Sequence, residues 1–220
     1  MISRHLEPAP GRYGLLLLLL IASYLMSAFF ASRWVETLQV VLFTAAALLA
    51  LRNSSVSRRA VRVLLFAAVA GLPVMLVLSL SPATGDTGTG IANIWTGLVL
   101  LASVALIVNR VLSFGTVTLQ SIFGAFSAYM IVGLMFAAFF AAIDHLGGGG
   151  FFAHGQPAKT QTFQYFSFTT LTTLGYGDFT AEHSSGQAVA VLEALTGQIF
   201  LATLVARLVA AFRAPADRER

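Results

Sequence analysis

The sequence contains no cysteine, which excludes disulfide bonds, thiolate metal sites and a cysteine nucleophile. Charge is also scarce, because Asp, Glu, Lys and Arg make up 10% of the 220 residues, against about 25% in an ordinary soluble domain. Hydrophobic residues fill the difference and reach 57% of the chain. This composition predicts an integral membrane protein.

Apolar stretches with at most one charged residue predict six membrane-spanning helices, since a helix needs roughly 20 predominantly apolar residues to cross the ~30 Å hydrocarbon core. The predicted spans cover about residues 13–31, 34–51, 63–82, 91–109, 119–143 and 186–206. The uncharged run over 111–143 is too long for one crossing, so its first part, 111–118, is predicted to be an interfacial linker. Residues 1–12 form the predicted N-terminal segment, and 13–110 form a predicted four-helix membrane domain.

The distribution of Lys and Arg predicts the orientation of these spans. With the N-terminus inside, eleven of the thirteen basic residues lie at the inner face, and only Arg33 and Lys159 lie outside. We therefore expect a multi-pass protein of the cell or inner membrane with both termini in the cytoplasm. The net charge of +4 is spread over the ends of apolar segments, so no nucleic-acid partner is expected. A signal peptide is an alternative for the first span, but its leucine run is long and no small-x-small cleavage site follows.

The segment between the last two predicted spans changes character twice. It opens with four consecutive glycines and Pro157, which predict an irregular outer loop. Residues 160–172 then lack charge, glycine and proline, and predict a helix of roughly 20 Å, which is too short to cross a membrane. Such a helix must leave through non-helical backbone, which is tolerated at membrane depth only where protein buries it or water reaches it. The stretch "TLGYGD" is therefore predicted to line a pore or a cavity.

Residues Thr172 to Asp178, "TTLGYGD", resemble the selectivity filter of potassium channels in the tetrameric pore-loop superfamily, with Leu174 where valine or isoleucine is commoner. The resemblance covers about residues 119–213, and the filter is its only highly specific element. It implies a pore domain over 119–213, with a pore helix over 160–172, a filter over 173–177 and an inner helix over 186–212, before a cytoplasmic tail over 214–220. The predicted fold is therefore an all-α membrane protein with six transmembrane helices plus a re-entrant pore helix and selectivity filter.

The chemistry of this segment suits a dehydrated cation. A potassium ion in a narrow pore must exchange its water shell for oxygens, and a backbone with inward carbonyls supplies them at regular intervals. Successive carbonyls can point the same way only if some residues take φ > 0, which Gly175 and Gly177 permit at low cost. The Thr173 hydroxyl is predicted to be the innermost ligand, and the Tyr176 ring to point away from the axis. The predicted ion-binding residues are Thr173, Leu174, Gly175, Tyr176 and Gly177.

Neighbouring residues are predicted to support the filter. Asp178 places a carboxylate at the outer mouth, Tyr165 is a candidate hydrogen-bond partner for it, and Thr172 is the second predicted support residue. The predicted pore helix ends at the filter, so its negative end, about half an elementary charge, favours a cation there. One filter per chain supplies one wall, so the resemblance implies a homotetramer among membrane lipids. K⁺ is the expected permeant ion, with no cofactor and no metal site beyond K⁺.

Four residues of the last predicted span have two interpretations each. Glu193 could belong to a ring of carboxylates in the cavity, or it could be a hydrogen-bonded carboxyl behind the filter. Gly197 could be the bend at which the inner helix opens, or a close-packing contact. Phe200 and Leu204 could form an apolar constriction, or they could pack in the ordinary way.

Six spans with a filter between the last two resemble the plan of voltage-gated cation channels. The fourth predicted span, "IANIWTGLVLLASVALIVN", lacks the arginine series of a voltage sensor, so we expect a prokaryotic-type potassium channel that is not gated by a charged helix. A weakly selective cation channel and a non-conducting scaffold or transporter subunit remain alternatives. No enzyme is expected, because no acidic pair, Ser with His, or His cluster lies at matching depth. His145, His154 and His183 are expected to be solvated loop residues.

Overall fold

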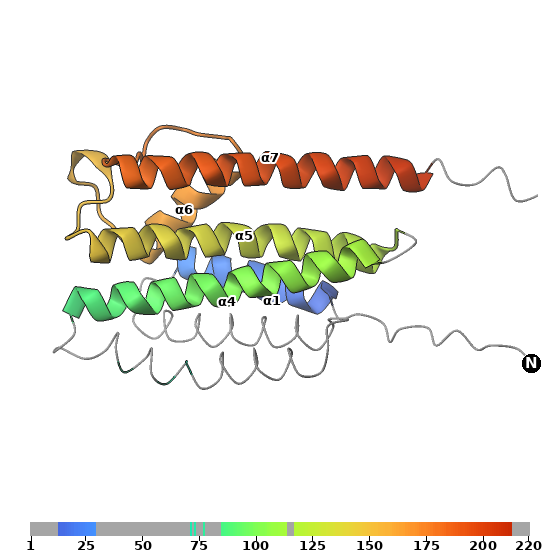
Figure 1. Cartoon of the computed structure of the whole chain (residues 1–220), viewed down its shortest axis with the longest axis horizontal. Coiled ribbons are helices and arrows are strands. Elements are labelled where there is room, and N and C mark those ends of the chain that lie inside the picture. Colours follow the sequence, from blue (N-terminus) through green and yellow to red (C-terminus); the bar gives the residue numbers. More distant parts are fainter. Residues whose placement is uncertain are drawn as a thin grey trace, which may run out of the picture.

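A computed structural model describes residues 13–29, 85–113 and 117–212, together with residues 71, 73 and 77. The regular elements of this part of the chain are all helices (Figure 1). Its strand-like feature is an isolated bridge between Phe152 and Ala181. The elements are α1 (Tyr13–Phe29), α4 (Gly85–Ser113), α5 (Leu119–Leu146), the 3-10 turn η1 (Ala153–Gly155), α6 (Thr160–Leu171) and α7 (Ser184–Phe212).

Three of these helices, α4, α5 and α7, are long and apolar enough to cross a membrane. Helix α1 is apolar but shorter, at 17 residues. The predicted first, fourth, fifth and sixth spans correspond in position to α1, α4, α5 and α7. The predicted spans over 34–51 and 63–82 lie outside the described residues, as do the predicted N-terminal segment and cytoplasmic tail. The described part is that of an all-helical membrane protein.

Helix α4 is longer at both ends than the sequence analysis predicted. It begins at Gly85, six residues before residue 91, where the fourth span was predicted to begin. Asp86 lies in its first turn, where a carboxylate is favourable at the positive end of the helix dipole. Gly90 allows a close approach of α5, because an added Cβ would lie 2.6 Å from a side chain of that helix. At its other end α4 continues into the predicted linker, where Val111 is buried.

Helix α5 begins at the predicted residue because a capping box precedes it. The Thr118 hydroxyl accepts the Ser121 N–H at 3.2 Å, and the Ser121 hydroxyl accepts the Thr118 N–H at 2.8 Å. These two bonds satisfy donors that the first turn of a helix leaves unpaired. The helix start is therefore encoded locally.

Helix α5 is the centre of the described structure. Figure 1 shows α4 and α1 along one side of it and α7 along the other, with α6 between α5 and α7. Of the most apolar stretch of α5, 67% is buried, whereas the corresponding value for α7 is 11%. The single chain therefore leaves most of the apolar surface of α7 uncovered.

Candidate functional site

The short helix α6 is fixed by a cluster of phenylalanines at one end of the molecule. Phe166 packs edge-on against Phe140 of α5, with ring centroids 5.0 Å apart. Phe163 packs against Phe152 of the preceding loop at 5.1 Å. All four rings are at least nine-tenths buried, and aromatic pairs of this kind contribute about 0.5–1.5 kcal/mol beyond the area they bury. These ring contacts therefore hold helix α6 in place, although the helix is short, at 12 residues.

The glycine-rich loop before α6 follows the backbone conformation that its sequence predicts. Gly148, Gly149 and Gly150 have φ values of 87°, 87° and 76°, which a residue with a side chain adopts only with strain. The loop is held by Asp144, whose buried Oδ1 accepts the N–H of Phe151 at 2.9 Å. The chain therefore returns to α6 along a fixed course.

The backbone after α6 alternates between two conformations. Thr173, Gly175 and Gly177 have φ values of 57°, 52° and 77°, and the residues between them do not have positive φ. The sequence pointed to the two glycines but not to Thr173, for which the left-handed region costs about 1–2 kcal/mol. Alternation between positive and negative φ allows successive carbonyls to point toward the same side.

Hydrogen bonds to the C-terminal end of α6 determine the direction in which the carbonyl groups of this segment point. The carbonyl oxygen of Thr169 accepts the N–H of Leu174 at 2.8 Å and the N–H of Gly175 at 3.1 Å. Each of these N–H groups belongs to a trans peptide, in which the carbonyl points the opposite way. The carbonyls of Thr173 and Leu174 therefore point away from α6. Within the described ranges, neither of them accepts a hydrogen bond.

The C-terminal end of this segment is tied to α6 through Asp178. The hydroxyl of Tyr165 donates to Asp178 Oδ2 at 2.8 Å, which is the pairing that the sequence suggested. The Tyr165 ring also stacks on Tyr176, with a centroid distance of 6.5 Å and an interplanar angle of 2°. The hydrogen bond to the carboxylate is the main cause that raises the pKa of Tyr165 to about 12. A second bond, from the Gln156 side chain to the Asp178 carbonyl, holds the same turn.

The N-terminal end of the segment is tied to α7 by a residue that the sequence analysis did not single out. Gln198 Nε2 donates to the Thr173 hydroxyl at 3.1 Å, and that hydroxyl donates to the Thr172 carbonyl at 2.7 Å. The Thr172 hydroxyl in turn donates to the Phe168 carbonyl at 2.7 Å. A polar residue directly after Gly197 in an apolar helix was the signal that could have identified Gln198.

Gly197 lies directly against the end of α6. A Cβ added at Gly197 would lie 2.1 Å from the carbonyl oxygen of Leu171 and 3.0 Å from its Cδ1. The same carbonyl accepts the Tyr129 hydroxyl of α5 at 3.1 Å, so three helices meet there. This placement matches the close-packing interpretation of Gly197, and α7 runs through it as one helix.

Glu193 is fully buried, one turn before Gly197. Its Oε1 lies 2.5 Å from the Ser167 hydroxyl of α6, and that hydroxyl lies 2.6 Å from the Gly133 carbonyl of α5. Its side chain therefore points into the packed interior of the chain. This placement matches the interpretation of Glu193 as a hydrogen-bonded carboxyl.

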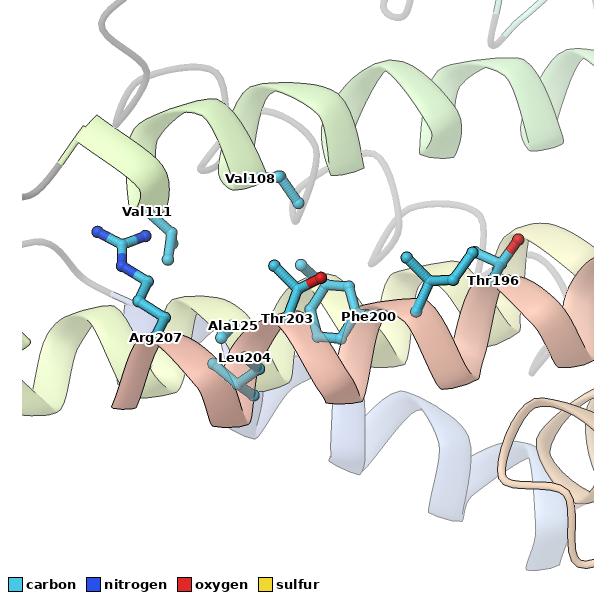
Figure 2. A pocket seen from close by; sticks show the side chains of 10 residues that line it. Val108, Val111, Ala125, Thr196, Phe200, Thr203, Leu204 and Arg207 are labelled. Atoms are coloured by element: carbon cyan, nitrogen blue, oxygen red, sulfur yellow. The ribbon is translucent and has the colours of Figure 1, made fainter. Parts of the chain in front are cut away.

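Phe200 and Leu204 face the chain's own α4 and α5. They line a cavity of about 330 Å³ together with residues of those helices and of α7 (Figure 2). The Phe200 ring packs on Tyr129 at 5.4 Å, and Arg207 marks one end of the cavity in Figure 2. The placement of both residues matches the ordinary-packing interpretation. The cavity is lined, in full, by Val108, Val111, Ala125, Ala128, Thr196, Ile199, Phe200, Thr203, Leu204 and Arg207.

The histidines do not assemble a metal site in the described part of the chain, where no group of three or more His, Cys, Asp or Glu residues lies close enough. His145 Nδ1 lies 3.6 Å from Asp86 Oδ1 at the start of α4, an ion pair only when the imidazole is protonated. His154, in η1, and His183, directly before α7, are exposed.

Residues 145–214 match a family model described as "Ion channel". The match covers about a third of the chain and includes the glycine-rich loop, α6, the alternating segment and α7. No curated protein matches the sequence. Together with the apolar helices, the family match supports a membrane-embedded ion channel of the pore-loop superfamily, and so a channel in place of an enzyme.

Proposed function

We propose that the chain is one subunit of a potassium-selective channel, with α6 as a re-entrant pore helix and residues 173–177 as the selectivity filter. The observation that carries this proposal is the alternation of positive φ at Thr173, Gly175 and Gly177, combined with amide bonds back to α6. This backbone presents consecutive carbonyl oxygens on one open side. Such a row of oxygens can replace the water shell of K⁺, and the Thr173 hydroxyl would add a ligand at the inner end.

A single chain supplies one wall of such a filter, so we propose a homotetramer around the filter axis. The exposed surfaces of the chain support this assembly. Leu174 and Tyr176 are 56% and 68% exposed, and most of the apolar stretch of α7 is uncovered. Neighbouring subunits would cover these surfaces toward the axis, and membrane lipids would cover the rest.

The electrostatics around the proposed filter favour cations at both ends. Asp178 lies at the outer end, where its carboxylate is held by Tyr165 and would concentrate cations. The C-terminal end of α6 lies at the inner end, and its partial negative charge would favour a cation in the space below. The proposed permeation path is therefore attractive to K⁺ throughout.

The proposed channel does not respond to voltage through a charged helix. Helix α4, which occupies the place of a voltage sensor in the six-span plan, has a single arginine, Arg110, near its end. A voltage sensor needs several charges inside the field, since each contributes about 2.3 kcal/mol per 100 mV. We place the protein in the cell or inner membrane as a multi-pass protein with cytoplasmic termini.

The test is a potassium flux assay on purified protein in liposomes, with the Gly175→Ala variant. An added Cβ at Gly175 meets no atom within 4 Å, so alanine acts through its φ of 52° and not through a clash. The strain of about 1–2 kcal/mol per subunit would deform the carbonyl row, and we expect at least a tenfold loss of flux with the oligomer intact. Gly14→Ala is the control, because its Cβ would make ordinary contacts at 3.5 and 3.7 Å.

The outcomes separate the proposal from its alternatives. Reversal potentials under opposed K⁺ and Na⁺ gradients that follow K⁺ alone support the proposed selectivity. Potentials near zero would show a weakly selective cation channel. No flux from the wild-type protein, with a correctly assembled oligomer, would leave the scaffold or transporter-subunit alternative.

A further inference from the structure

We propose that Glu193 is a neutral carboxylic acid whose proton ties α7 to α6 and α5 behind the proposed filter. The inference about protonation stands on the geometry of one buried cluster. Its consequence for conduction rests on the proposed function. Glu193 is a positioning residue in this proposal, because it contacts the helix that carries the filter and not the ion.

The cluster consists of three oxygens in a row. Ser167 Oγ, itself fully buried, lies 2.5 Å from Glu193 Oε1 and 2.6 Å from the carbonyl oxygen of Gly133. Both distances are those of O–H···O hydrogen bonds, so each gap must contain a proton. The Gly133 carbonyl can only accept, and the Ser167 hydroxyl has one proton to donate.

Counting protons therefore determines the state of the carboxyl group. If Ser167 donates to Gly133, the proton in the other gap must come from Glu193. If Ser167 donated to an ionised Glu193, two acceptor oxygens would face each other at 2.6 Å with no proton between them. The arrangement in which both contacts are satisfied has Glu193 as donor through Oε1, Ser167 as relay and Gly133 as final acceptor.

The surroundings of Glu193 agree with a neutral group. The described structure provides no ion pair between Glu193 and a basic side chain. Helix α5 presents Tyr129, a titratable group that interacts electrostatically with Glu193 and whose hydroxyl donates to the Leu171 carbonyl. Helix α6 presents Ser167, which does not titrate. An ionised carboxylate without a counter-charge in a buried site costs several kcal/mol. Oε2 has no hydrogen-bond partner among the described residues, a deficit that a neutral carbonyl oxygen tolerates better than an anion.

The cluster lies where it can control the base of the proposed filter. Ser167 precedes Leu171 by one helical turn, and Glu193 precedes Gly197 by one turn on α7. The two helices therefore touch through the Glu193–Ser167 contact and again through Gly197 and Leu171. Loss of the proton would leave the Gly133 carbonyl or the carboxylate unpaired and place an uncompensated charge against α6. We expect conduction to fall as pH rises far enough to remove this proton.

The test compares Glu193→Gln with Glu193→Ala in liposome flux from neutral to alkaline pH. Glutamine keeps a donor for Ser167 and cannot ionise, so we expect flux within about twofold of wild type at neutral pH and no alkaline loss. Alanine removes the tie, and we expect reduced flux and an oligomer that dissociates more readily at every pH. A Glu193→Gln variant that assembles but loses flux severalfold at neutral pH would overturn the proposal, because that is the result of an ionised ring in the cavity.

A second readout needs no flux and so separates this inference from the proposed function. Infrared difference spectra of wild type minus Glu193→Gln at neutral pH should contain the C=O stretching band of a protonated carboxylic acid. Glu182→Gln is the matched control, because Glu182 is exposed in the outer loop and should contribute only carboxylate bands. A carboxylate signal in place of the acid band at position 193 would overturn the proposal, whatever the channel conducts.

Discussion

The Gly197→Ala substitution tests how closely α7 approaches the end of α6. The added Cβ would lie 2.1 Å from the Leu171 carbonyl oxygen, whereas ordinary contacts begin near 3.4 Å, so the two helices must separate by about 1 Å. Overpacking of this kind costs about 1–3 kcal/mol, and loss of the Tyr129 hydrogen bond adds about 1 kcal/mol. The higher helix propensity of alanine relative to glycine offsets less than about 1 kcal/mol of this loss. We therefore expect a net loss of about 1–4 kcal/mol in the free energy of unfolding per subunit.

The assay is thermal or denaturant unfolding of the oligomer in detergent, together with potassium flux in liposomes. Leu171 leads directly into Thr172 and Thr173, so the displacement should reach the proposed filter and lower the flux at least tenfold. Gly14→Ala, which adds the same methyl group without a clash, should leave stability and flux unchanged. If Gly197 acted only as a hinge, alanine would leave stability intact and change only the fraction of open channels. A Gly197→Ala protein as stable and as conductive as wild type would refute the close approach.

Two further predictions concern the ends of the proposed filter. Tyr165→Phe should lower K⁺ over Na⁺ selectivity by loosening Asp178, and tyrosine absorbance should lose one group that ionises near pH 12. The raised pKa of Tyr165 gives the direction of the pH dependence. The Tyr165–Asp178 hydrogen bond contributes fully to stability below the unfolded pKa of 10.0, and this contribution is lost as pH rises through about 12. A wild-type titration without the late group would contradict the bond. Gln198→Ala should alter the occupancy of the innermost ion site, because Gln198 donates a hydrogen bond to Thr173. The measurement is block of the flux by a larger cation, which should change severalfold, and Gln198→Glu is the control for charge. Unchanged block in both variants would contradict this role.

The positions of the helices follow from the sequence because membrane insertion depends on local composition. Long apolar stretches predicted the positions of α5 and α7 closely, and the Thr118–Ser121 capping box fixes where α5 begins. The start of α4 was missed because glycine, threonine and aspartate over 85–90 usually form turns. There the packing of α5 against Gly90 decides the conformation, and such tertiary contacts are absent from a local pattern.

The proposed site also combines features that residue type predicts with features that depend on tertiary contacts. Gly175 and Gly177 could be assigned positive φ from residue type alone, whereas Thr173 adopts it because the amides after it bond to Thr169. The partner of Asp178 was predictable, since a tyrosine on α6 was the nearby donor in the sequence. The Gln198 contact joins residues 25 positions apart and depends on how α7 crosses the end of α6. Long-range geometry of this kind has no signature in spacing.

The contacts of α7 divide the helix into two parts with different freedom to move. From Glu193 to Gln198 it is held by the buried carboxyl cluster, the close approach to Leu171 and the bond to Thr173. From Thr196 onward one side of it borders the cavity shared with α4 and α5, where lining side chains lack packing partners on one side (Figure 2). A motion of α7 that leaves the proposed filter in place therefore costs least C-terminal to Gln198, where α4 lies across the cavity. Under the proposed function, we expect α4 to act on the pore through packing across that space, which needs no charge on α4.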